Sequence, residues 1–267
     1  EENRNIPEKE KMDYQLLMDT AVLAGEIMLV AGAETYRVED TIYRMLKTSG
    51  FERCDVFVVA TGIMATLADW RVDTISITRR VGEKSTNLGN ISDVNEISRK
   101  YCGGEITLKQ AFHNLKRIQS KRYPIWLNYV CMILTAAFFT LLLGGGWAES
   151  CFASVNGLFI VFSQMINRKF KINGFVLNMA VSFLMSFTCQ GFAKLPGITL
   201  DMELLIAGSI MALLPGVAIT NAIRDTLQGD YMSGAARVIE AFVIAASLGV
   251  GVGAGLSFGG FVFGGEF

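Results

Sequence analysis

The chain has 267 residues and a formal charge of −1 at pH 7, but its charged residues are unevenly distributed. Residues 1–124 contain 18 basic and 18 acidic side chains, whereas residues 125–267 contain only 6 and 7. The second part is too long and too apolar for one compact soluble core, and neither part has the basic excess of a nucleic-acid-binding protein.

Residues 1–120 have the periodicities of a small α+β domain. Apolar residues first recur at helical spacing, then give way to short segments rich in Val, Ile and Thr that are typical of an antiparallel meander, and then return to helical spacing. We expect helices over 13–31 and 36–47, strands over 55–60, 63–69 and 74–79, and helices over 93–101 and 108–120.

The signals for catalysis or cofactor binding are weak in this domain. His113 is the only histidine and is expected on a solvated helix surface, so a histidine-based triad or metal site has little to build on. The five cysteines form no CxxC pair, and Gly103-Gly104 lacks the Lys-Ser/Thr of a phosphate-binding loop. We therefore expect no enzyme, catalytic residue, metal or cofactor, and no nucleic-acid partner.

After Pro124, five apolar segments are each long enough to cross a lipid bilayer as a helix, which takes about 20 residues. The predicted spans are 125–143, 147–166, 174–193, 203–222 and 235–257. The sequence therefore predicts an α-helical membrane protein with five transmembrane helices in residues 121–267, preceded by a small cytoplasmic α+β domain in residues 1–120.

The basic residues of the loops predict the orientation. The segment before the first span is rich in Lys and Arg, the next loop has none, and the loop after the second span carries Arg168, Lys169 and Lys171. Cytoplasmic loops retain positive charge. We expect the N-terminus in the cytoplasm and the C-terminus outside.

The fourth and fifth spans carry the candidate site. Pro215 removes a backbone donor and Gly216 weakens the helix, and broken helices of this kind help to bind substrates in transporters. Asn221 and Asp225 are four residues apart and share a helix face. The candidate substrate-path residues are Pro215, Gly216, Asn221, Arg224, Asp225, Arg237 and Glu240.

A structural interpretation of the same residues stays open. In this interpretation Arg224 and Arg237 extend to lipid headgroups. Asp225 and Glu240 pair with these arginines, and Pro215 is only a kink in the helix. In the functional interpretation Arg224 or Arg237 binds an anionic substrate, and Asp225 takes the amino group of a zwitterion.

Two further patterns concern helix packing. The run from Gly249 to Gly255 contains two GxxxG pairs and predicts a close-packing surface for another helix. The uncharged polar residues of the other spans favour hydrogen bonding between helices over a hydrophilic path. These residues are Asn128, Asn156, Gln164 and Asn178.

Several ordered segments resemble the threonine/serine exporter family, specifically its longer split-type subunit with a soluble N-terminal domain and five spans. They are Gly32-Ala33-Glu34, Arg122-Tyr123-Pro124-x-Trp126, Gly145-Gly146-Trp147, and Leu214-Pro215-Gly216 with Asn221-Ala222, Asp225, Gly229, Gly234 and Arg237.

This resemblance implies a subunit of a secondary exporter that moves threonine/serine-type amino acids or succinate-type dicarboxylates out across the bacterial inner membrane. It also implies a shorter five-span partner subunit, and we expect a higher oligomer. The odd number of spans agrees, because repeat-built transporters form their site between two halves. The alternative is a regulatory or scaffolding subunit whose cytoplasmic domain senses a ligand while the partner carries the pathway.

Overall fold

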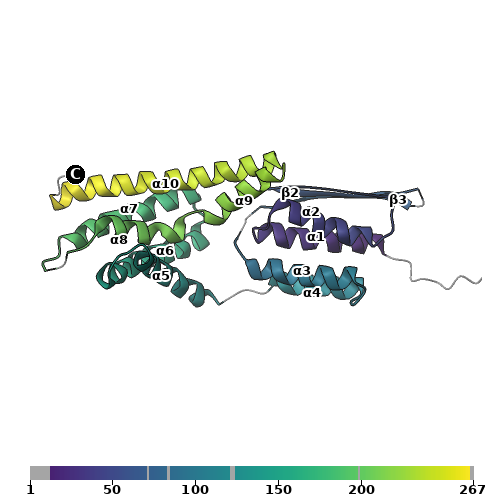
Figure 1. Ribbon diagram of the computed structural model, residues 1–267, viewed down its shortest axis with the longest axis horizontal. Helices are drawn as coiled ribbons and strands as arrows, with labels where there is room; N and C mark the ends of the chain where they lie inside the picture. The colour runs from purple at the N-terminus through teal and green to yellow at the C-terminus, as the bar shows by residue number, and fades with distance from the viewer. Residues whose placement is uncertain (1–12, 71, 83–84, 121–123, 198, 265–267) are drawn as a thin grey trace, which may run out of the picture. The chain divides into compact units, whose positions relative to one another are not determined.

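The computed structural model describes residues 13–70, 72–82, 85–120, 124–197 and 199–264 (Figure 1). Arg122 and Tyr123 of the family-like motif lie outside these residues. The chain forms two compact units. The first comprises residues 1–121 and Val217–Val238, and the second comprises Arg122–Gly216 and Ile239–Phe267. Residues 217–238, which the sequence analysis placed in the membrane part, thus pack with the N-terminal domain.

The first unit contains the predicted α+β domain. Its elements are α1 (Tyr14–Val30), α2 (Thr35–Lys47), β1 (Arg53–Val59), β2 (Gly62–Asp69), β3 (Val72–Arg80), α3 (Leu88–Cys102) and α4 (Leu108–Ser120). The strands form an antiparallel sheet in the order β1-β2-β3. Figure 1 shows this sheet on one side of α1 and α2, with α3 and α4 on the other.

Helix α1 is the centre of this unit. It contacts α2, α3, α4 and two strands, which explains why its sequence is apolar on nearly every face: a helix that is covered all round has no polar side. Leu17, Met18 and Met28 of α1 are completely buried, together with Ile42 of α2 and Leu115 of α4.

The predicted helices and strands of this unit are present, with shifted ends. The largest shift is at α3, which begins at Leu88 instead of 93. The reason is a helix cap, because the Asn87 side chain accepts a hydrogen bond from the Asn90 N–H at 3.1 Å and satisfies a donor that the first turn leaves free. His113 is exposed on α4, as predicted.

The second unit is built from apolar helices. They are α5 (Ile125–Leu142), α6 (Trp147–Phe170), α7 (Gly174–Ala193), α8 (Met202–Ile210) with the short 3₁₀ helix η1 (Met211–Leu213), and most of α10 (Tyr231–Phe263). Large apolar side chains such as Phe138, Phe162 and Phe242 are exposed, as expected for helices that contact lipid.

Among the described residues, four helices are long and apolar enough to cross a membrane: α5, α6, α7 and α10. A fifth span exists only if α8–η1 and α9 (Gly216–Leu227) are counted together, and these are bent by 62° at their junction. The predicted span 203–222 is therefore not one continuous helix. The break predicted at Pro215 is confirmed, and its cause is the missing backbone donor of proline.

For Asn156, the predicted role of a polar residue that links helices is confirmed. It is completely buried on α6. Its amide donates to Ser209 Oγ of α8 at 2.8 Å, and its amide oxygen accepts from Thr188 Oγ1 of α7 at 2.9 Å. One side chain thereby ties three helices together.

The glycines of α10 show how closely the helices pack. A Cβ atom on Gly251 would overlap Ser182 Oγ and the Met179 carbonyl oxygen of α7, whereas a Cβ on Gly249 or Gly253 would meet none of the described residues within 4 Å. Gly255 packs on α7 in the same way as Gly251. Among the described residues, Gly251 and Gly255 therefore form the predicted GxxxG packing surface, whereas Gly249 and Gly253 face no close neighbour.

Candidate functional site

Most of the predicted site residues lie in the corner formed by α9, the turn at residues 228–230 and the beginning of α10, which we call the α9–α10 corner. Helix α9 ends before Gly229, whose φ of +89° is a conformation that suits glycine. Asp230 then caps α10, because its Oδ1 accepts from the Ser233 N–H at 3.2 Å. A Cβ on Gly234 would overlap the Thr226 hydroxyl. Both family-like glycines thus allow a tight corner between two closely packed helices.

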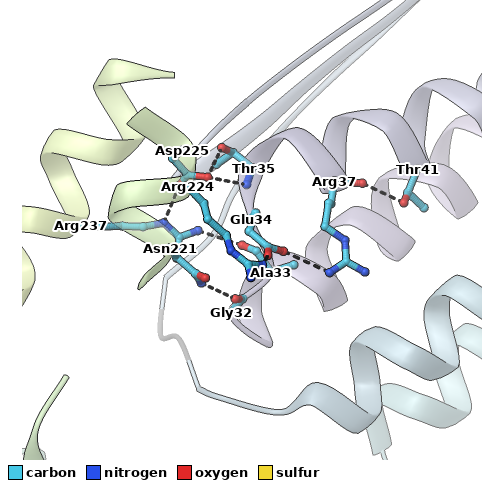
Figure 2. A network of polar contacts seen from close by, with 10 residues as sticks. All are labelled: Gly32, Ala33, Glu34, Thr35, Arg37, Thr41, Asn221, Arg224, Asp225 and Arg237. Carbon is cyan, nitrogen blue, oxygen red and sulfur yellow. Dashed lines mark hydrogen bonds and ion pairs between the residues drawn. The ribbon is translucent and has the colours of Figure 1, made fainter. Parts of the chain in front are cut away.

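The α9–α10 corner packs against the loop between α1 and α2 (Figure 2). Gly32 has a φ of +87°, which turns the chain after α1. The Gly32 carbonyl oxygen accepts from Asn221 Nδ2 at 2.7 Å, and the Ala33 carbonyl oxygen accepts from Arg237 Nη2 at 2.9 Å. Two side chains of the corner therefore bind the backbone of the Gly-Ala-Glu motif.

A buried ion pair lies at the centre of the contact. Arg237 Nε and Asp225 Oδ2 are 2.9 Å apart, and the two side chains are 4% and 0% exposed. Asp225 Oδ1 also accepts from the Thr35 N–H at 3.2 Å and the Thr35 hydroxyl at 3.0 Å. Paired and hydrogen-bonded charges are the form in which buried charges are tolerated.

The hydroxyl of Thr35 faces a second acid. Its distance to Asp230 Oδ2 is 2.7 Å, which is within hydrogen-bonding range. Thr35 itself is completely buried at the beginning of α2. One threonine side chain thus lies between the acids Asp225 and Asp230.

Glu34 joins two arginines beside this centre. Its Oε1 pairs with Arg224 Nη1, and its Oε2 lies 3.2 Å from Arg37 Nη1. Burial opposes ionisation, but hydrogen bonds from its own backbone N–H and from Arg224 outweigh burial and lower the pKa of Glu34. The Arg224 side chain is 56% exposed and that of Arg37 is 40% exposed, so both positive charges can be reached from solvent.

The structure brings together four of the seven predicted site residues: Asn221, Arg224, Asp225 and Arg237 (Figure 2). Pro215 and Gly216 lie at the helix break and belong to the second unit, as does the exposed Glu240. Thr35 and Asp230 were not among the predicted site residues. The available signal was the adjacent motif Gly32-Ala33-Glu34, which carries the family resemblance.

Glu39 of α2 has an unusual environment near the same corner. Its Oε1 accepts from the Val58 N–H at 2.8 Å. Burial raises the pKa of Glu39; the Val58 hydrogen bond opposes this rise, and the negative charge of Asp230 adds to it. An acid with a raised pKa holds its proton more tightly in the folded chain, so stability falls as pH rises from about 4.5 through the raised pKa.

We therefore expect Glu39→Gln to raise the melting temperature at pH 7, because glutamine keeps the oxygen that accepts from Val58 but carries no charge. The gain should shrink below pH 4.5, where wild-type glutamate is also neutral. The matched control is Glu96→Gln, since a hydrogen bond from Lys100 lowers the pKa of Glu96 and its loss should not stabilise the protein. A lower melting temperature for Glu39→Gln at pH 7 would contradict the prediction.

Comparison with known proteins identifies the family. A family described as "Putative threonine/serine exporter" (ThrE) matches residues 19–259. The chain belongs to the ThrE family. The match includes both the Gly32–Thr35 loop and the α9–α10 corner, so the network in Figure 2 lies wholly within the ThrE-like sequence. No solved structure matches the chain.

Relatives of the chain differ in length. The chain is 24% identical to a "Probable threonine/serine exporter" of Mycobacterium tuberculosis, with 88% of this chain and 45% of that protein covered. It is 22% identical to the "Threonine/serine exporter" of Corynebacterium glutamicum, with 90% and 50% covered. The "Probable succinate transporter subunit YjjP" of Klebsiella aerogenes is 23% identical, with 91% and 94% covered. The chain therefore spans about half of the two exporters and nearly all of the subunit.

Proposed function

We propose that the chain is a subunit of a secondary exporter that moves small polar metabolites out across the bacterial inner membrane together with a shorter five-span partner. The substrates would be amino acids such as threonine and serine, or dicarboxylates such as succinate. The observation that carries this proposal is the helix broken at Pro215, which is followed within three turns by Asn221, Arg224 and Asp225. Family membership and the apolar helices support transport across a membrane.

The proposed roles of the site residues follow from their exposure. Arg224 is more than half exposed and can meet a substrate carboxylate, for which a guanidinium is well suited. Asp225 and Arg237 are buried and paired, so we assign them to holding the corner in place. Direct binding of an amino group by Asp225 would require release of its present partners. Pro215 and Gly216 would set the change of helix direction at the break, as in the broken helices of other transporters.

The arrangement in the membrane is also a proposal. The basic loops favour a cytoplasmic N-terminus and an external C-terminus. The word subunit in the name of the YjjP relative supports a partner. We propose that a second subunit completes the transporter and that the complex is a higher oligomer.

The test is counterflow in proteoliposomes that contain the chain alone, the partner alone, or both. Labelled serine, threonine and succinate are assayed in parallel. We expect exchange of one substrate class only when both subunits are present, because neither subunit alone would form the complete site. No exchange by a stable complex would contradict the exporter proposal.

A second candidate is a regulatory or scaffolding subunit. It is favoured by the engagement of Asn221, Asp225 and Arg237 with the Gly32–Thr35 loop, since these polar atoms are then used for structure. The same experiment separates the two functions. Exchange by the partner alone, with a rate that changes when this chain is added, would support regulation.

A further inference from the structure

A cavity of about 670 Å³ lies between α2 and α3 in the first unit. This volume is within the range of small-molecule binding sites. Its polar lining includes Arg37, Asp40, Arg44, Asn95, Ser98 and Arg99. Three arginines and one acid make the lining net positive, which favours an anionic occupant.

The three arginines differ in how far they are already neutralised. Arg44 Nε lies 2.8 Å from both carboxylate oxygens of Asp40, so this pair is satisfied locally. Arg99 is exposed, and within the described part of the chain its guanidinium has no hydrogen bond or ion pair. Arg37 has a 3.2 Å contact with Glu34, and 40% of its side chain is exposed. Arg37 and Arg99 are therefore the arginines available to a ligand.

We propose that this cavity binds a small organic dianion through Arg37 and Arg99. The arginine fork matches a carboxylate or a phosphate equally well, so both chemistries fit the positive lining. Asn95 and Ser98 add polar groups to the same wall. This proposal concerns binding alone and does not depend on the transport function.

The structure also gives the cavity a connection to Arg224. Glu34 holds Arg37 with one carboxylate oxygen and Arg224 with the other (Figure 2). A ligand anion that takes Arg37 competes with Glu34 and leaves that carboxylate to Arg224. The ligand and Glu34 compete for Arg37, and such coupling is reciprocal. A change at Glu34 must therefore alter the affinity of the cavity for the anion, although Glu34 does not line the cavity.

Cys102 provides a direct readout of occupancy. It lines the cavity and its thiol is free. The full-length chain is prepared with Cys54, Cys131 and Cys151 replaced by serine, and the rate of maleimide labelling at Cys102 is measured. The probes are succinate, adenosine monophosphate and serine, with sodium chloride at equal ionic strength as reference. We expect succinate or adenosine monophosphate to slow labelling at least threefold over chloride, and serine to have no effect.

The variants test the assigned residues. Arg99→Gln and Arg37→Gln should each raise the ligand concentration that half-protects Cys102 from labelling by about tenfold, since each substitution removes a charge-assisted contact. Glu34→Gln is expected to lower this concentration several-fold, because the carboxylate that competes with the ligand for Arg37 is then neutral. The control is Arg53→Gln, an exposed arginine on β1 that pairs with Asp55 and should leave protection unchanged.

Either half of the proposal can be overturned. Equal protection by chloride and by both dianions would reject the binding site. Protection that Arg99→Gln leaves intact would reject it as well, and this exposed residue can be replaced without disturbing the core. Protection that depends on Arg99 but is unchanged by Glu34→Gln would reject the connection to Arg224.

Discussion

Replacing Asp225 by asparagine is expected to destabilise the protein by about 3–5 kcal/mol and to abolish transport, because it leaves the buried guanidinium of Arg237 without its counter-ion. Arg237→Gln should cost a similar amount, since it leaves the carboxylate of Asp225 buried and unpaired. The double variant should cost less than the sum of the two, because it removes both charges. Melting temperatures in detergent and counterflow activity are measured on the same preparations.

The matched control for this experiment is Arg224→Gln. It makes the same chemical change as Arg237→Gln in the same network, but the Arg224 side chain is 56% exposed. Its partner Glu34 is 6% exposed but keeps Arg37 at 3.2 Å, so the carboxylate is not left unpaired, and we expect a smaller loss of stability than for Arg237→Gln. Wild-type stability for both Asp225→Asn and Arg237→Gln would show that the ion pair is not buried in the native protein.

The second large effect is expected at the α7–α10 contact. Gly251→Ala places a methyl group where the Met179 carbonyl oxygen lies. This oxygen belongs to the backbone, so relief requires separation of two helices, and overpacking of this kind costs about 1–3 kcal/mol. The measurement is the melting temperature in detergent.

Gly253→Ala is the control, two residues along the same helix. Its Cβ would meet nothing within 4 Å in the part of the chain that the structure describes, and alanine is the better helix former by about 1 kcal/mol. We therefore expect Gly253→Ala to leave the melting temperature unchanged or to raise it. Equal losses for Gly251→Ala and Gly253→Ala would contradict the assignment of the packing face.

Local sequence patterns were sufficient for most individual elements. The helical periodicity of α1 and α2, the Val- and Ile-rich strands, and the long apolar runs of α5, α6 and α7 each depend on neighbouring residues, so they are visible in the sequence. The break at Pro215 was predictable because a proline breaks a helix wherever it stands in the interior. The start of α3 was missed because a single cap residue, Asn87, decides it.

The arrangement around Asp225 could not be predicted in the same way. Its partner Thr35 is 190 residues away in the chain, and no periodicity connects two segments so distant. Helix spacing and charge group Asn221, Arg224, Asp225 and Arg237. Their partners are backbone and side-chain groups of the α1–α2 loop, which only the folded chain brings beside them.

The hydroxyl of Thr35 allows two arrangements of hydrogen bonds in the α9–α10 corner. A hydroxyl group carries a single hydrogen atom, yet Thr35 Oγ1 lies 3.0 Å from Asp225 Oδ1 and 2.7 Å from Asp230 Oδ2. It can donate to only one of these acids at a time. Rotation about the Cβ–Oγ1 bond moves that hydrogen from one acid to the other while every heavy atom stays in place. The α9–α10 corner can therefore hold the dipole of this hydroxyl in two directions with identical packing, and the two states differ only in which acid accepts the hydrogen bond.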